Sequence, residues 1–242
     1  SHEILDILKR ALDMKSMAPS LCLQGKTVVL IFEKPSLRTK VSFDVAIHEL
    51  GGHPIYLGRD EVGLGIREDI PDVAQVISRY ASALVVRTFA HNTLETLAKY
   101  ASIPIINALS NDEHPCQALA DLLTIYEKKG HVKGLNLAYI GDGNNVATSL
   151  AIGAALLGIN FTIACPEEYQ IPNKPWQNIL RIASINDSQA KHVEEPKEAL
   201  KDADAVYTDV WVSMGQEKET QRRHEIFSSY RIDESLLLQA KD

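Results

Sequence analysis

The sequence predicts an α/β fold of two βαβ domains, each a parallel sheet flanked by helices. Short apolar runs alternate with longer amphipathic segments along all 242 residues. Strands separated by helices pair in parallel, because the crossover helix returns the chain to the same end of the sheet. A polar turn at 128–134 interrupts the alternation. We therefore expect one domain over residues 1–130 and a second over 131–242.

The elements follow from local composition. Short apolar runs predict strands at 27–32, 54–57, 83–86, 103–107, 135–140, 160–164, 192–193 and 205–208. Segments with helical spacing predict helices at 40–50, 69–78, 93–100, 114–127, 145–157, 176–184, 196–203 and 232–240. Residues 1–15 are amphipathic and do not resemble a signal peptide. The stretch 215–231 is polar with no apolar stripe, which predicts a long loop of functional or mobile character.

Composition excludes several classes of protein. A content of 45% hydrophobic and 24% charged residues is typical of a globular domain, and a net charge of −7 disfavours nucleic acid as a partner. The three cysteines form no metal-binding spacing, which indicates reduced thiols and a cytoplasmic setting. No apolar run is long enough to span a membrane, so we expect no membrane partner.

The junction after the first strand predicts an anion site. Pro35 ends that strand, and Ser36 stands at the N-cap of the helix that follows. The first turn of a helix has unpaired N–H groups at the positive end of its dipole. Arg38 and Thr39 add a charge and a hydroxyl there, although an ordinary first turn would more often carry acids. These features favour a phosphate pocket over an ordinary capped helix with a solvated basic turn.

Other polar clusters also follow predicted strands, where ligands bind in parallel sheets. They are Arg87, Thr88 and His91; His114 and Gln117; Asp142, Asn144 and Asn145; and Asp209, Ser213 and Met214. Together with the phosphate pocket, these clusters predict one composite active site in the cleft between the domains.

Each cluster has a simpler alternative. Arg87 is either part of a structural salt bridge or a second anion clamp. His114 and Gln117 share a helix face and suit a carbonyl or an amide, whereas Cys116 does not face His114 and is better explained as an inert buried thiol.

The glycine-rich turn at 141–145 is a weak match to a dinucleotide fingerprint, because Val146 stands where the third glycine would be. Its asparagines suit a small polar ligand instead. Asp209 would bind an amine beneath a closing loop, or it belongs to a capped loop that Trp211 anchors.

In order and spacing, these motifs closely resemble those of the ornithine carbamoyltransferases. The matching segments are SLRT at 36–39, VRTF at 86–89, HPCQ at 114–117, DGNN at 142–145 and DVWVSMG at 209–215. The Ser-x-Arg-Thr and His-Pro-x-Gln motifs also occur in aspartate carbamoyltransferases. The Ser-Met-Gly loop is specific to ornithine.

The resemblance implies transfer of the carbamoyl group from carbamoyl phosphate to the δ-amine of L-ornithine, giving L-citrulline and phosphate. The first domain would bind carbamoyl phosphate and the second ornithine. The residues implied for carbamoyl phosphate are Ser36, Leu37, Arg38, Thr39, Arg87, His114 and Gln117, and those for ornithine are Asn145, Asp209, Ser213 and Met214. Arg87, His114 and Asp209 would be catalytic. The family uses no metal or organic cofactor, assembles as trimers or multiples of trimers, and serves arginine biosynthesis or degradation with the same chemistry.

Two departures from the family pattern leave alternatives open. Family members usually continue to a His-Cys-Leu-Pro segment, whereas this sequence ends at Asp242, so we expect the second domain to be incomplete. Gly63 replaces a glutamine that, in many members, reaches the neighbouring subunit. The alternatives are a truncated or inactive subunit that binds carbamoyl phosphate without turnover, and a transferase for a related amine.

Overall fold

The computed structural model describes residues 2–17, 20–213 and 215–241, in which the chain forms two compact units. The first unit comprises residues 13–116, and the second comprises residues 1–12 together with 117–242. Each unit contains a four-stranded sheet in which every neighbouring pair is parallel. The predicted fold class, two parallel sheets flanked by helices, is therefore confirmed.

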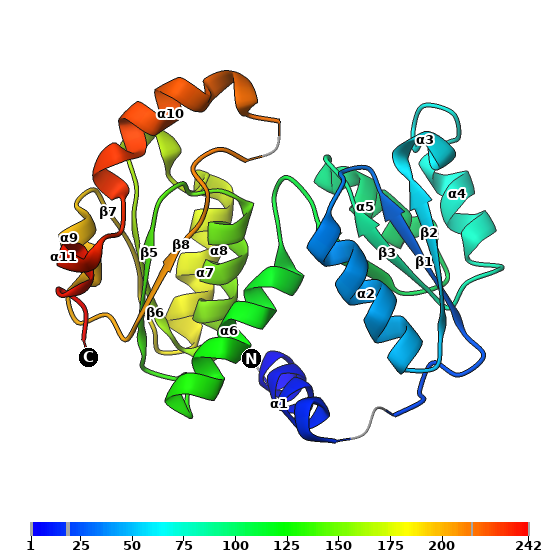
Figure 1. The fold of residues 1–242 in the computed structure, drawn as a ribbon, viewed down its shortest axis with the longest axis horizontal. Helices are drawn as coiled ribbons and strands as arrows, with labels where there is room; N and C mark the ends of the chain where they lie inside the picture. The colour runs from blue at the N-terminus through cyan, green and yellow to red at the C-terminus, as the bar shows by residue number, and fades with distance from the viewer. Residues whose placement is uncertain (1, 18–19, 214, 242) are drawn as a thin grey trace. The chain divides into compact units, whose positions relative to one another are not determined.

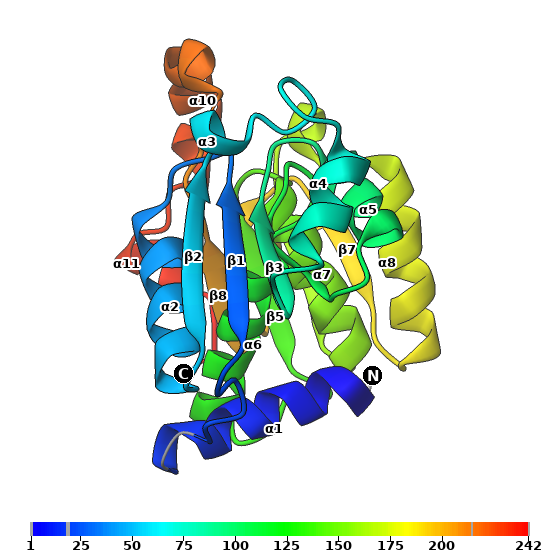
Figure 2. The same cartoon turned by 90° about the vertical axis from the view of Figure 1, so that its right-hand side faces the viewer.

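The first sheet has the strand order β2-β1-β3-β4. Its strands are β1 (Thr27–Phe32), β2 (His53–Gly58), β3 (Ala83–Arg87) and β4 (Ile105–Leu109). Its helices are α2 (Leu37–Glu49), α3 (Arg59–Val62), α4 (Ile70–Ile77) and α5 (His91–Tyr100). Figure 2 shows α2 on one face of the sheet and α4 and α5 on the other.

The second sheet has the order β7-β6-β5-β8. Its strands are β5 (Asn136–Ile140), β6 (Asn160–Ala164), β7 (Ala190–Val193) and β8 (Ala205–Thr208). Its helices are α7 (Asn145–Leu157), α8 (Asn173–Ile185), α9 (Pro196–Leu200), α10 (Thr220–Phe227) and α11 (Glu234–Leu237). Figure 1 shows α7 and α8 on one face of this sheet, and α9 and α11 on the other. The helices α1 (His2–Ser16) and α6 (Pro115–Lys129) each contain a boundary between the units.

Both sheets are buried on both faces, as the unbroken apolar strands require. In β1, Val29 and Ile31 pack in the core that includes α4 and α5, whereas Val28 and Leu30 pack in the core that includes α2. The strands of the second sheet divide in the same way between two further cores. No helix in the described part of the chain is long and apolar enough to cross a bilayer.

The chief error of the sequence prediction lies in the stretch 215–231, which is not a loop throughout. Its central residues form α10, with Arg223 and Phe227 buried. One of these two inward positions is a charged residue, so the segment shows no apolar stripe. The predicted helix at 232–240 is also wrong in extent, because α11 has four residues.

Candidate active site

The turn after β1 has the cradle-like local structure that the predicted anion site requires. Ser36 is the N-cap of α2, and its side chain accepts a hydrogen bond from the backbone N–H of Thr39 at 3.3 Å. Its hydroxyl also donates to Thr39 Oγ1 at 2.9 Å. The helix begins at Leu37, earlier than predicted, so Leu37, Arg38 and Thr39 form its first turn. The Thr39 N–H is used by the cap, whereas the backbone N–H groups of Leu37 and Arg38 precede the first intrahelical acceptor and suit an anion.

Arg87 closes the cradle from the end of β3. It is only 6% exposed and donates from Nη1 to Thr39 Oγ1 at 3.3 Å. Among the residues that the structure describes, no carboxylate forms an ion pair with Arg87, and its Nε has no hydrogen-bond partner. Burial and the neighbouring charge of Arg38 lower its pKa. The structural salt bridge that was the alternative for Arg87 is therefore not formed.

His114 belongs to the same electrostatic environment. Burial, and then the positive charge of Arg87, lower the pKa of His114 to about 4. The imidazole is therefore neutral at physiological pH, and it can donate or accept a hydrogen bond without adding positive charge.

Two residues that the sequence analysis did not select hold the strand ends of the first sheet. Lys34 is 6% exposed, and its Nζ donates to Asn111 Oδ1 at 2.6 Å. The carboxylate of Glu33 accepts hydrogen bonds from the Thr88 hydroxyl and from the backbone N–H of Phe89. The adjacent pair Glu33 and Lys34 thus ties the end of β1 to the loops after β3 and β4. A charged pair directly after an apolar strand was the available signal.

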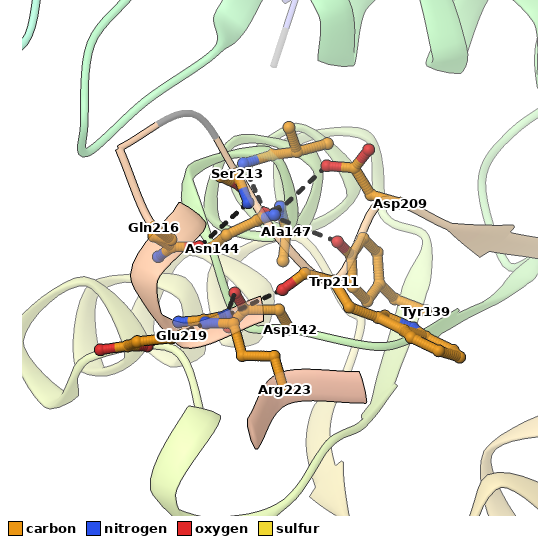
Figure 3. Close-up of polar contacts among 11 residues, drawn as sticks. Tyr139, Asp142, Asn144, Ala147, Asp209, Trp211, Ser213, Gln216, Glu219 and Arg223 are labelled. Atoms are coloured by element: carbon orange, nitrogen blue, oxygen red, sulfur yellow. Dashed lines mark hydrogen bonds and ion pairs between the residues drawn. The ribbon is translucent and has the colours of Figure 1, made fainter. Parts of the chain in front are cut away.

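In the second unit, Asp209 follows β8 and is held by Asn144 (Figure 3). The Asn144 amide Nδ2 donates to Asp209 Oδ2 at 3.2 Å. Its carbonyl oxygen caps α7 by accepting from the backbone N–H groups of Val146 and Ala147. One asparagine therefore both begins the helix and orients the carboxylate. Asn145 forms the first residue of α7.

The packing around Gly143 accounts for a glycine in the turn at 141–145, so no bound nucleotide is needed to explain it. The backbone N–H of Gly143 donates to the Tyr169 carbonyl oxygen at 2.8 Å. A Cβ atom at this position would lie 2.6 Å from the same oxygen, closer than real contacts permit. The glycine is thus required by the close approach of the loop that contains Tyr169, rather than by a bound pyrophosphate.

Arg223 is the most important side chain of this region that the sequence analysis missed. It lies on α10 with a 7% exposed side chain, and its Nη1 donates to Asp142 Oδ2 at 2.6 Å and to the Trp211 carbonyl oxygen at 3.0 Å. Its Nε also pairs with Glu219 at 3.1 Å. Figure 3 shows these groups converging on the guanidinium. Arg223 therefore fastens the segment after β8 to the Asp142 turn.

The remaining predicted residues are placed as follows. The backbone N–H of Ser213 donates to Gln216 Oε1 at 3.0 Å, and Met214 lies outside the described residues. His91 Nδ1 lies 2.8 Å from the Ser110 hydroxyl.

At the start of α6, the Cys116 thiol donates to the Asn107 carbonyl, and burial raises the pKa of the thiol, as expected of an inert cysteine. Gln117 is exposed, and its amide donates to the Asp121 carboxylate at 3.0 Å.

Two parallel-sheet units, one with a buried arginine beside a helix N-terminus and one with an oriented carboxylate, fit a class of protein that the family models identify. The carbamoyl-P binding domain of aspartate/ornithine carbamoyltransferases matches residues 1–127, and the Asp/Orn binding domain matches residues 133–242. The chain belongs to the aspartate/ornithine carbamoyltransferase family.

Its similar relatives are ornithine carbamoyltransferases. The protein of that name from Anoxybacillus flavithermus is 49% identical over 90% of this chain and 70% of its own length. The one from Archaeoglobus fulgidus is 46% identical over 99% of this chain and 78% of its own. The solved structure from Pyrococcus furiosus has a TM-score of 0.96 and 45% identity, and covers 99% of this chain and 78% of that one.

Proposed function

We propose that this chain transfers the carbamoyl group of carbamoyl phosphate to the δ-amine of L-ornithine, giving L-citrulline and phosphate. The observation that carries the proposal is the buried Arg87 beside a capped helix N-terminus, a cationic cradle without a carboxylate of its own among the described residues. The relatives' names supply the identity of the amine. The alternatives, an inactive carbamoyl phosphate-binding subunit or an enzyme for a related amine, are not favoured by any feature described above.

In this proposal, residues 1–130 bind carbamoyl phosphate. Ser36, Leu37, Arg38 and Thr39 hold the phosphate through the first turn of α2, and Arg87 bridges toward the carbonyl oxygen. Attack on the carbonyl carbon places negative charge on that oxygen. Arg87, Thr39 and neutral His114 stabilise this charge without having to reorganise, as oxyanion-hole donors do. Gln117 contacts the carbamoyl amide, and phosphate leaves into the cradle. No covalent enzyme intermediate is needed, because positioning and fixed charge supply the rate gain.

The second unit binds ornithine through Asn145, Asp209, Ser213 and Met214. Asp209 orients the amine, and Asn144 holds that carboxylate in place. An alkylamine has a pKa near that of lysine, about 10.4, and a carboxylate alone favours its charged form. A further group must therefore assist proton loss before the amine can attack. Closure of the segment after β8 would exclude water from the reaction.

The wider setting extends the same proposal. Residues 1–130 form the carbamoyl phosphate domain and residues 131–242 the ornithine domain of a cytoplasmic enzyme of arginine biosynthesis, consistent with the word "anabolic" in the name of the Pyrococcus furiosus relative. We further propose that the protein assembles as a homotrimer or a multiple of trimers. An exposed apolar stripe on α2, formed by Leu37, Val41 and Val45, suits a contact between subunits. Gly63 adopts a left-handed conformation at the end of α3, with φ of +61°, and carries no side chain to reach a partner.

The test is citrulline formation by the purified chain with carbamoyl phosphate and L-ornithine, with putrescine, N-acetylornithine and L-aspartate as competing amines. We expect ornithine to be the one amine of the four that is carbamoylated. Turnover with another amine in its place would reassign the substrate. No turnover, together with protection of the chain against heat by phosphate, would favour the binding-only alternative.

A further inference from the structure

The exposed side chain of Gln117, in the first turn of α6, makes one hydrogen bond that orients its amide. Its amide Nε2 donates to Asp121 Oδ1 at 3.0 Å, one helical turn further along. A carboxylate can only accept hydrogen bonds, so the nitrogen end of the Gln117 amide must face Asp121. The carbonyl end, Oε1, is left as an acceptor for another group.

The surroundings of Asp121 restrict its carboxylate, although Oδ2 has no hydrogen-bond partner among the described residues. It is half-buried, and the hydroxyl of Tyr207 on β8 lies beside it. Burial raises the pKa of Asp121, and the neighbouring Tyr207 hydroxyl and Gln117 amide oppose that shift. The Tyr207 ring stacks on buried Tyr139, with centroids 5.5 Å apart and an interplanar angle of 17°. A chain of contacts therefore runs from the core of the second sheet to the amide of Gln117.

We propose that Asp121 is a positioning residue that fixes the amide of Gln117 with its oxygen toward the ligand, so that the site selects a substrate bearing an N–H group at that point. This inference rests on the proposed function. A carbamoyl group carries an NH₂ that can donate to Oε1. An acetyl group has a methyl in the same place and can donate nothing, and a polar site rejects an analogue that lacks its hydrogen-bond partner.

The direct test is Asp121→Asn. The asparagine amide can donate, so the Gln117 amide is free to turn its nitrogen toward the ligand. We expect the KM for carbamoyl phosphate to rise about tenfold, the effect of one lost hydrogen bond. The inhibition constant of acetyl phosphate, a competitor without the N–H, should change less than about twofold, because its affinity does not use that bond. Equal losses for both compounds would show a merely structural role and overturn the proposal.

A reciprocal exchange provides the rescue. Gln117→Glu alone places two carboxylates together and should also weaken carbamoyl phosphate. In the double variant Gln117→Glu with Asp121→Asn, the asparagine donates to the glutamate, which again presents an oxygen to the ligand. The total charge is that of the unchanged protein. We expect the KM to return to within about threefold of its original value, since the direction of the hydrogen bond is restored.

The outcomes separate this inference from the proposed function. If the unchanged protein forms no citrulline, the proposed function fails and this inference fails with it. If the unchanged protein is active and the double variant, with an unchanged melting temperature, is no better than either single variant, only the role of Asp121 is overturned.

Discussion

Arg87 and Arg223 are buried to the same degree, each 6% exposed, yet their surroundings are opposite. Arg223 contacts two carboxylates and a backbone carbonyl, all supplied by the second unit. Arg87 contacts a hydroxyl and lies near another arginine, with no ion pair in the described part of the first unit. The second unit thus neutralises Arg223 internally, whereas the described part of the first unit leaves Arg87 without a carboxylate partner.

The pKa values of the two arginines shift in opposite directions, which agrees with this contrast. Burial lowers the pKa of both, because it disfavours the charged form. At Arg87 the charge of Arg38 lowers it further, while at Arg223 the bonds to Asp142 and Glu219 reverse the shift, and the pKa is raised. A buried cation without a counter-ion is costly to the fold, so its presence in the first unit indicates a function.

The largest effect on stability is expected at Arg223. The Arg223→Met substitution leaves Asp142 buried without its partner, and should lower the free energy of unfolding by about 3–5 kcal/mol. Denaturant unfolding measures this. The companion substitution Asp142→Asn in the same background should restore part of the loss by removing the stranded charge. A loss below about 1 kcal/mol would mean that the pair behaves like a surface salt bridge.

The largest effect on turnover is expected at Arg87. The Arg87→Met substitution removes an oxyanion donor and should lower kcat by about 10²–10³-fold, with little change in the KM for ornithine. Stability should be unchanged or higher, because an unpaired buried charge is removed. Steady-state kinetics test the predicted loss of turnover, and a melting curve tests the predicted stability. Unchanged turnover would end the assignment of Arg87 to catalysis.

Ornithine binding should depend on Asp209. We expect Asp209→Asn to raise the KM for ornithine by about tenfold or more, since a hydrogen bond to a charged group is lost. The KM for carbamoyl phosphate serves as the control and should change little. The reverse pattern would place Asp209 with the other substrate.

Stabilisation by inorganic phosphate also tests the contrast between Arg87 and Arg223, with a smaller expected effect. At a concentration of 100 times its Kd, phosphate should stabilise the unchanged protein by about 2.7 kcal/mol, and Arg87→Met much less. An unchanged phosphate effect in Arg87→Met would locate the anion elsewhere. Arg223→Met, although destabilised, should keep its response to phosphate.

The smallest expected effect is a shift in a titration. The pKa of His114, lowered from 6.5 to about 4, should rise in Arg87→Met, because one of its two causes is removed. Between pH 4 and 6.5 the unfolded chain binds the proton and the folded chain does not, so this group makes stability rise with pH in that window. NMR titration of the His114 ring measures the pKa directly. A pKa that stays near 4 in the variant would assign the whole shift to burial.

The sequence predicted well where one local signal was enough. The strands at 27–32, 160–164 and 205–208 and the helix at 145–157 have the predicted bounds. Their apolar runs are bounded by proline, glycine, asparagine or aspartate, residues that favour strand ends and caps for local reasons. Placement of Ser36 at an N-cap depended on the same kind of evidence.

The sequence predicted poorly where a distant group decides the outcome. Helix α10 has few apolar residues, and the inward position of Arg223 becomes intelligible only once Asp142, 81 residues away, is seen beside it. Lys34 and Asn111 are 77 residues apart and show no shared pattern in the chain.

By itself, the sequence determined the parallel α/β class, the order of the strands and the identity of the polar residues that follow them, because hydrophobic periodicity and capping act over a few residues. Only the tertiary structure decided which charges are neutralised and which are not. That distinction depends on side chains brought together from distant parts of the chain, and it separates Arg223, which pairs with two carboxylates, from Arg87, which pairs with none in the described residues.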